Sequence, residues 1–108
     1  MHNLAFLHEA IAQAIPDREC IVFRDRRHSW ATTTDRTRRF ADVLRAHGLG
    51  CHTERSAGAL APWESGQDHV ALYLTNGNEY LEGMLGAYKA RCAPFNVNYR
   101  DVEDELLY

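Results

Sequence analysis

Residues 68–90 read DHVALYLTNGNEYLEGMLGAYKA, and residues 93–100 read APFNVNYR. The apolar run Val70–Leu74 is nearly continuous, which is typical of a strand buried on both faces of a sheet. After a polar turn, the pattern predicts a helix over about Glu79–Ala90 and a second short strand at Phe95–Val97. Because the connections are short, we expect a βαβ unit with adjacent, parallel strands and a right-handed crossover.

The predicted helix carries large apolar side chains that we expect to face the core. They are Tyr80, Leu81, Met84, Leu85 and Tyr88. A second interpretation is an aromatic pocket lined by four tyrosines: Tyr73, Tyr80, Tyr88 and Tyr99. These tyrosines lie in or beside apolar runs, so packing in the core is the better-supported interpretation. A further helix is expected to begin at Val102.

An amphipathic helix is expected at the start of the chain. Asn3 is placed to cap its first turn, and Pro16 ends it because the residue before proline avoids helical angles. Four apolar residues at helical spacing form one stripe: Leu4, Leu7, Ile11 and Ile15. A hairpin follows, with Cys20–Phe23 and His28–Trp30 as its strands and a polar turn between them.

A second helix is expected to run from the threonine cluster Thr32–Thr34, which offers capping hydroxyls, to about His47. Its expected buried face holds Phe40, Val43 and Leu44. Gly48 is placed to end this helix. The stretch from Gly48 to Asp68 has little periodicity and predicts a long loop. Loops beyond about 12–15 residues are uncommon unless they are functional or disordered.

Composition and charge exclude several classes of protein. With a net charge of -3 and a pI near 6.0, the chain offers no basic face for nucleic acid. Its arginines cluster locally, but Asp25 and Asp35 lie among them and indicate an ion-paired surface. The sequence contains no run of about 18 apolar residues, the length that a membrane-spanning helix needs. Its first residues lack the basic region of a signal peptide. Three widely spaced cysteines argue against a disulfide framework, so we expect a cytoplasmic protein.

No residue of the sequence has the type and spacing expected of a catalytic, cofactor-binding or metal-ligating residue. His47, Cys51 and His52 share one region but lack the tight spacing of a metal site. Cys92 precedes a strand, which favours a small core residue over a nucleophile. The acidic run Glu103–Glu105 is explained by the dipole of the helix that it begins. No GxSxG elbow is present, and Gly48-Leu49-Gly50 follows a helix rather than a strand, unlike a dinucleotide loop.

A family resemblance covers nearly the whole chain except about 51–64. Residues 68–90 resemble the stretch GDxVALxLxNxxEYxExMLAxxKA of the adenylate-forming superfamily, and Ala93–Arg100 resembles its x-P-x-N-V-N-Y-R segment. Val102–Leu107 is similar to its V-E-D-E-L helix, and the earlier helix, hairpin and helix occur in the family's order. The chain is therefore similar to the N-terminal subdomain of bacterial fatty-acyl-CoA synthetases.

The resemblance implies an α/β fold in which residues 1–108 form part of the AMP-binding domain, with a loop insertion at about 51–64. Gly48–Gly50 and Gly66–Asp68 look like the two ends of a short family linker that the insertion separates. Asn96, Asn98 and Arg100 would fix the strand-to-helix turn. Asp101 stands where the family has an apolar residue, and it is placed to cap the next helix.

The implied activity is that of an acid–thiol ligase. Such enzymes join a carboxylate to ATP as an acyl-adenylate, release pyrophosphate, and pass the acyl group to the thiol of coenzyme A, with magnesium assisting. The motifs that bind ATP, magnesium and coenzyme A have no counterpart in these 108 residues. The resemblance therefore gives this chain no catalytic, cofactor-binding or metal site, and it implies a part that is inactive alone and associates through apolar surface.

Three hypotheses about function remain open at this point. The first is the N-terminal piece of a fatty-acyl-CoA synthetase. The second is the same superfamily acting on an aryl acid or a steroid side-chain acid, because the acid pocket lies outside this sequence. The third is a non-catalytic module that binds or regulates a partner.

Overall fold

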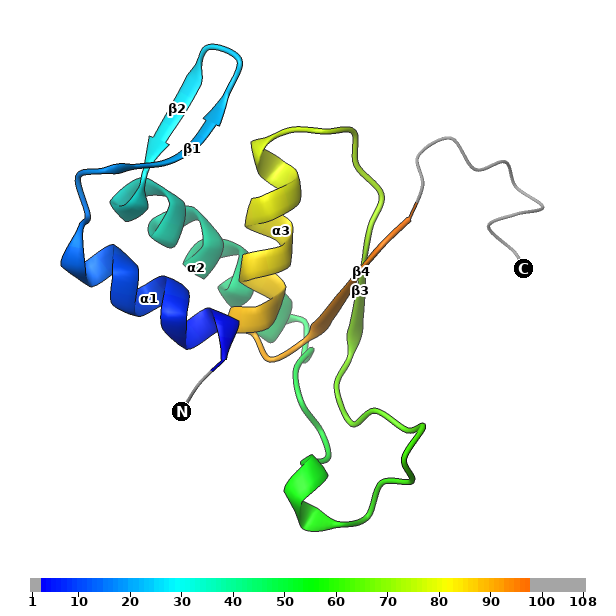
Figure 1. Cartoon of the computed structure of the whole chain (residues 1–108). Coiled ribbons are helices and arrows are strands. Elements are labelled where there is room, and N and C mark those ends of the chain that lie inside the picture. Colours follow the sequence, from blue (N-terminus) through cyan, green and yellow to red (C-terminus); the bar gives the residue numbers. More distant parts are fainter. Residues whose placement is uncertain (1–2, 98–108) are drawn as a thin grey trace.

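The structure is a computed structural model, and it describes residues 3–97. A hairpin and three helices lie to one side of a pair of parallel strands, and a long loop extends from the end of that pair (Figure 1). Helix α3 packs against both parallel strands and against the other two helices. The expected fold class, α/β with a helix–hairpin–helix before a βαβ unit, is confirmed.

Helix α1, Leu4–Ala14, begins where the sequence indicates. The Asn3 side chain accepts a hydrogen bond from the Phe6 N–H at 2.8 Å and so caps the first turn. The apolar stripe, however, faces outward, with Leu4, Leu7 and Ile11 exposed at 57%, 48% and 38%. The buried face consists of His8 and Ala12 instead. A short imidazole and a methyl group allow α1 to lie close to its neighbours.

Strands β1, Glu19–Phe23, and β2, Arg26–Ser29, form the predicted antiparallel hairpin, but Trp30, which was expected in its second strand, begins the next helix instead. The turn contains no glycine, and Arg24 supplies its left-handed backbone with a φ of 56°. A bidentate ion pair between Arg27 and Glu19 joins the two strands. The hairpin leads directly into the second helix.

Helix α2, Trp30–Ala46, starts before the threonine cluster that was expected to cap it. Its N-cap is Ser29, whose hydroxyl accepts a hydrogen bond from the Thr32 N–H. The threonines continue the helix, and Thr33, Thr34 and Thr37 are buried. Of the expected buried face, Leu44 is buried and Phe40 is partly buried, while Val43 is 51% exposed. Gly48 ends the helix with a φ of 78°, as predicted.

The loop from Gly48 to Asp68 is closed at its base by an isolated antiparallel bridge between Cys51 and Gln67. Within it lie the short 3-10 helix η1, Arg55–Ala57, and Trp63, which is 85% exposed. Glu54 forms an ion pair with Arg91, which ties the loop to the end of α3. That this segment is an insertion relative to the family stays a prediction.

The βαβ unit consists of β3, His69–Leu72, then α3, Asn78–Lys89, and β4, Ala93–Asn96. The two strands are parallel, with Val70 opposite Pro94 and Ala71 opposite Phe95, which confirms the predicted pairing. The expectation that β3 is buried on both faces is wrong for the described residues. Leu72 is buried against α3, but His69 and Ala71 are exposed on the opposite face.

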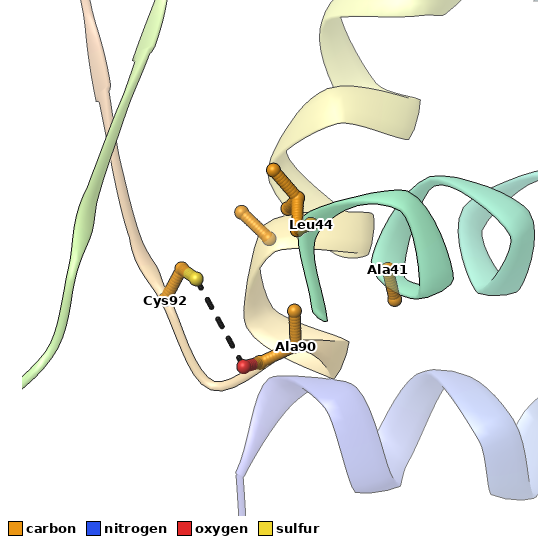
Figure 2. Close-up of a cluster of buried hydrophobic side chains, with 5 residues drawn as sticks. Ala41, Leu44, Ala90 and Cys92 are labelled. Atoms are coloured by element: carbon orange, nitrogen blue, oxygen red, sulfur yellow. Dashed lines mark hydrogen bonds between the residues drawn. The ribbon is translucent and has the colours of Figure 1, made fainter. Parts of the chain in front are cut away.

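The core is small and lies where α2, α3 and the start of β4 meet (Figure 2). Its members are Ala41, Leu44, Ala87, Ala90 and Cys92. The inward face of α3 differs from the prediction, because its buried residues are polar or small: Asn78, Glu82, Gly83, Gly86 and Ala87. Leu81 is 41% exposed, and the other expected core residues of α3 are only partly buried. Close packing of α2 on α3 favours small side chains at the crossing.

The expectations for Asn98, Tyr99, Arg100, Asp101 and the helix from Val102, including Glu103–Glu105, fall outside residues 3–97. Within the described part of the chain, no helix combines the length and apolar character needed to cross a membrane.

Candidate functional site

Glu82 is the one carboxylate that is buried within residues 3–97, and donors from three elements surround it. Its Oε1 atom accepts hydrogen bonds from Arg36 Nε on α2 and Asn78 Nδ2 on α3, both at 2.9 Å. His28 Nδ1 on β2 lies 3.3 Å from the same oxygen. Asn78 in turn accepts a hydrogen bond from Arg26. This Glu82 cluster joins the hairpin to both long helices.

The electrostatics of the Glu82 cluster keep the carboxylate ionised. Burial alone raises the pKa of Glu82, but the hydrogen bonds from Arg36 and Asn78 outweigh burial and lower it. A general acid or base needs a pKa near the working pH and access to a substrate. The lowered pKa of Glu82 does not meet the first condition, and its Oε1 atom is already engaged by Arg36 and Asn78, which favours a structural role for the cluster.

A second buried charge is the ammonium group of Lys89, whose side chain is only 6% exposed. Its Nζ atom donates to Thr37 Oγ1 at 2.7 Å and lies 3.0 Å from Glu9 Oε1 on α1. Burial lowers the pKa of Lys89, although Glu9 opposes the effect. The hydrogen bond from Arg38 lowers the pKa of Glu9 to about 2. This Lys89 cluster fastens α1 to the other two helices.

Next to this cluster, His8 is buried on the inner face of α1 and is 6% exposed. Its ring lies 5.2 Å from the Trp30 ring, centroid to centroid. Neither ring nitrogen has a hydrogen-bond partner among residues 3–97. Burial and the nearby charge of Lys89 lower the pKa of His8, while Glu9 acts in the opposite direction. The histidine is therefore held in its neutral form.

A groove of about 600 Å³ runs along β3 beside α2 and α3. The strand contributes residues 70–74 to it, α2 contributes Arg36, Arg39 and Phe40, and α3 contributes Glu79, Glu82 and Gly83. The charged groups at its wall are already paired: Arg36 with Glu82, Arg39 with Asp35, and Glu79 with Arg26. The groove therefore presents apolar side chains and the backbone of β3.

The three residues considered as metal ligands, His47, Cys51 and His52, do not converge on one point. His52 bonds to Asp68, His47 Nδ1 lies 2.8 Å from the carbonyl oxygen of Val43, and Cys51 bonds to the carbonyl oxygen of Thr53. Residues 3–97 contain no group of three or more His, Cys, Asp or Glu side chains that could hold a metal ion.

Cys92 is a core residue, as predicted. It is 1% exposed, burial raises the pKa of its thiol, and its Sγ atom lies 3.9 Å from the carbonyl oxygen of Ala90 (Figure 2). The tyrosines do not form one pocket, because Tyr73 lines the groove along β3 while Tyr88 lines a separate hollow near Asn3. Tyr80 is partly buried.

The N-terminus of α3 is a further candidate for a phosphate site, since helix N-termini bind anions. Here the helix supplies its own negative charge. The Glu79 backbone N–H and the Arg26 guanidinium both bond to the Glu79 carboxylate and lower its pKa. The same carboxylate stands 2.8 Å from the position that a Cβ on Gly77 would take. A triphosphate does not fit this end of the helix.

The Glu82 cluster and the Lys89 cluster were not predicted from the sequence, although the sequence contains a signal for them. Asn78, Glu82 and Lys89 are placed at helical spacing on the face of α3 that also carries Gly86. Polar side chains that share a helix face with glycines and alanines indicate a tightly packed, hydrogen-bonded joint. The large apolar side chains, which predicted the buried face, lie on the other side of the helix.

Comparison with known proteins identifies the family to which the sequence is similar. The model of the AMP-binding enzyme family matches residues 8–108. The chain is 54% identical over 100 residues to the medium-chain acyl-CoA ligase Mig of Mycobacterium avium, covering 93% of this chain and 18% of that protein. It is 33% identical over 106 residues to the 3-oxocholest-4-en-26-oate–CoA ligase of Rhodococcus rhodochrous, covering 98% of this chain and 16% of that protein.

A solved structure shows the same fold. The N-terminal domain of FACL13 from Mycobacterium tuberculosis superposes with a TM-score of 0.78 at 25% identity. The match covers 98% of this chain and 24% of that domain's chain. The chain thus spans about a sixth of the length of the curated relatives and about a quarter of the solved domain.

Proposed function

Because this chain belongs to the AMP-binding enzyme family, we propose that it serves as the N-terminal part of an ATP-dependent, AMP-forming acyl-CoA ligase. The observation that carries the proposal is its identity to a medium-chain acyl-CoA ligase across nearly its whole length. The complete enzyme would activate a fatty acid in two steps. The carboxylate attacks ATP to give an acyl-adenylate and pyrophosphate, and the thiol of coenzyme A then displaces AMP. We place this activity in the cytoplasm, as part of fatty acid metabolism.

Within that enzyme, the role of this part is to build and hold the scaffold. The buried carboxylate and ammonium groups are engaged in ion pairs between elements, which supports a structural role. Residues beyond this sequence would bind ATP, magnesium and coenzyme A. On its own, the chain is expected to be inactive.

The acid substrate has a second candidate. Relatives named for 3-oxocholest-4-en-26-oate, a steroid side-chain acid, match over 98% of this chain at about one-third identity. Their lower identity favours the medium-chain fatty acid. A non-catalytic binding module remains the alternative outside the ligase class.

A chimera tests the proposal. The segment of the Mycobacterium avium ligase that matches this chain is replaced by residues 1–108, and acyl-CoA formation is measured with ATP and a medium-chain fatty acid. We expect a rate within about tenfold of the parent, because a compatible scaffold should change the barrier by less than about 1.4 kcal/mol. Two controls are the chain alone and the ligase without its own segment, and both should be inactive in ATP–pyrophosphate exchange.

A chimera that folds but forms neither adenylate nor thioester would overturn the proposal. Exchange activity in the chain alone would also overturn it, because these residues would then contain a complete site. Replacing the same segment with an unrelated α/β fragment of equal length controls for activity that needs no specific scaffold.

A further inference from the structure

The loop arm, residues 51–67, extends from the end of the strand pair and has an uncharged tip (Figure 1). Residues 56–63 form this tip and read SAGALAPW. Trp63 is 85% exposed, more than any other large apolar side chain among residues 3–97. Tryptophan is enriched among the few residues that carry most of the energy of a protein interface. The tip is therefore a candidate interaction surface.

The tip of the loop arm is held in one shape by hydrogen bonds within the arm. The Arg55 guanidinium donates to the carbonyl oxygen of Ala61 at 3.0 Å and to that of Glu64. The Glu64 carboxylate in turn accepts a hydrogen bond from the Ala61 N–H at 3.1 Å. These bonds fix the backbone on both sides of Trp63. A loop that is ordered in advance loses less conformational freedom when it binds, so the arm is suited to a partner of defined shape.

The base of the loop arm is tied to a strained residue at the end of α3. Arg91 has a φ of 63° at the position after the helix where glycine is the usual residue. Its guanidinium donates to Glu54 Oε2 at 2.8 Å, and its carbonyl oxygen accepts a hydrogen bond from Gln67 Nε2 at 2.9 Å. Left-handed backbone at a residue other than glycine is a reason to look for function nearby. Here the arginine fixes the arm against the body of the fold.

A hollow of about 410 Å³ opens beside the base of the loop arm. Leu4 and Ala5 of α1, Tyr88 and Arg91 at the end of α3, and Gln67 line it. The polar groups of Arg91 and Gln67 are already engaged, whereas Leu4 is 57% exposed. Pockets of about 300–1,000 Å³ bury small organic groups, so the hollow is large enough for an aromatic side chain. We call it the α1–α3 hollow.

The loop arm and the α1–α3 hollow lie at the same end of the molecule (Figure 1). Strand β3 begins at His69, just after the arm, and β4 begins at Ala93, just after the hollow. Both features thus lie at the amino ends of the parallel strands, whereas α/β sheets bind ligands beyond the carboxyl ends. Two copies with their arms side by side and antiparallel would place each tip at the other's base. Such a contact is reciprocal and closes under a two-fold axis.

We propose that the loop arm is a dimerisation element, and that Trp63 of each copy inserts into the α1–α3 hollow of a second copy. This interface goes beyond the proposed function. A protein pocket fits the arm better than a lipid surface does, because segments that bind membrane surfaces present free lysines and arginines. The arm has one arginine and no lysine, and that arginine, Arg55, is engaged by carbonyl groups of the arm itself.

Sedimentation velocity over a series of concentrations tests the interface, in the chain and in the chimera described above. Both should show an equilibrium between monomer and dimer. Trp63→Ser should raise the dissociation constant of the dimer at least about 30-fold, because it removes the anchor from both contacts. It should leave the thermal midpoint of the monomer unchanged, since the side chain faces solvent. Ser56→Ala, on the same tip, is the matched control and should change neither quantity.

The exposed side of α1 could also bring copies together, and its contribution is removed by design. Every protein in the series carries Phe6→Ser and Leu7→Ser. These residues are 53% and 48% exposed, and neither lines the α1–α3 hollow. Any dimer that remains must then form through another surface.

A mixing experiment identifies the reciprocal contact. Ala5→Trp fills the α1–α3 hollow from α1 and should also prevent the dimer. A mixture of the Trp63→Ser chain with the Ala5→Trp chain should form a heterodimer, because the first keeps an open hollow and the second keeps its anchor. Neither variant alone should dimerise. If Ala5→Trp prevents folding, Leu4→Arg replaces it, since Leu4 lines the same hollow and is more exposed.

Four outcomes would overturn the inference. They are a monomer at every concentration, a dimer that Trp63→Ser leaves unchanged, two variants that fail to complement each other, and a dimer of the chain but not of the chimera. In the last case the rest of the ligase would occupy the hollow. Sedimentation of the monomer with phosphatidylcholine vesicles, lost in Trp63→Ser, would assign the tip to a lipid surface instead. An active, monomeric chimera overturns the interface and leaves the ligase assignment standing, whereas an inactive dimer that depends on Trp63 does the reverse.

Discussion

At the scale of single residues, many of the deeply buried side chains of this chain are polar. Thr33, Thr37 and Asn78 are at most 2% exposed, and together with Cys92 they are the largest fully buried side chains among residues 3–97. Buried polar groups stabilise a fold only when their hydrogen bonds are formed. The stability of this piece therefore depends on the geometry of its polar contacts as much as on apolar area.

His8 makes the stability of the chain depend on pH. Its pKa is held below the ordinary value of 6.5, first by burial and then by Lys89. Between 6.5 and that lowered value the unfolded chain binds more protons, so the free energy of unfolding falls as the pH drops through this range. The slope is at most about 1.4 kcal/mol per pH unit for one proton. Thermal midpoints measured from pH 7.5 to pH 5 check the expected fall.

His8→Leu is the matched variant. It removes the titrating ring and the unpaired nitrogens while keeping a buried apolar side chain, so its midpoint should be nearly flat over the same range. Both proteins should lose stability below about pH 4.5, because the lowered pKa values of Glu9 and Glu82 make ionised carboxylates part of the fold. A variant with the same slope between pH 7 and pH 5 as the parent would assign the effect elsewhere.

At the scale of elements, the crossing of α2 and α3 depends on Gly86. A Cβ at this position would lie 2.6 Å from Phe40 Cδ2 and 3.1 Å from the carbonyl oxygen of Thr37. Alanine is better than glycine in a helix by about 1 kcal/mol, but a Cβ here would overlap the Phe40 ring and crowd the Thr37 carbonyl oxygen, so α2 and α3 must shift apart. Gly86→Ala should therefore reduce the free energy of unfolding by about 1–3 kcal/mol, measured by urea denaturation.

Gly83→Ala, one turn earlier on the same helix, is the control. The nearest atom to its Cβ would be Leu72 Cδ2 at 2.9 Å, the end of a side chain that can rotate away. Propensity and repacking should nearly cancel, which leaves a change within about 1 kcal/mol. If Gly86→Ala reduced the free energy of unfolding no more than Gly83→Ala, then α2 and α3 would not be in close contact at Gly86.

The sequence predicted the order and type of the elements and some of their ends, because these depend on local chemistry. The Asn3 cap, the Gly48 stop and the parallel pairing of β3 with β4 are all observed. It was wrong about which faces are buried. Large apolar residues on α1 and small or polar residues on α3 both recur at helical spacing, and only the neighbouring elements decide which side faces inward. The groove along β3 needed three elements in place and had no signal in the sequence.

At the scale of the whole molecule, the chain exposes apolar side chains on several faces. Leu4, Phe6 and Leu7 on α1 and Phe95 on β4 are each about half exposed. Large exposed apolar patches mark interaction surfaces. We therefore expect the purified chain to bind a hydrophobic dye and to form larger species as its concentration rises. Dye fluorescence and sedimentation velocity measure the two effects.

The double variant Phe6→Ser with Leu7→Ser should reduce both effects without unfolding the chain, because both side chains already face solvent. Arg18→Ser, at an exposed polar site, is the control and should change neither. A monodisperse monomer that does not bind the dye would contradict the expectation and favour a self-sufficient binding module.

The closed base of the long loop bears on how this protein can be modified. The N–H of His52 donates to the carbonyl oxygen of Gly66 at 2.7 Å, and the bridge from Cys51 to Gln67 holds the two sides together. Gly66 is required there, because a Cβ would lie 1.9 Å from the carbonyl oxygen of Thr53. The two ends of the loop thus leave the fold side by side, held together by this bridge. A fluorescent reporter or an affinity tag inserted in place of residues 54–65 would be attached through these paired ends. Lengthening such a loop adds little closure entropy.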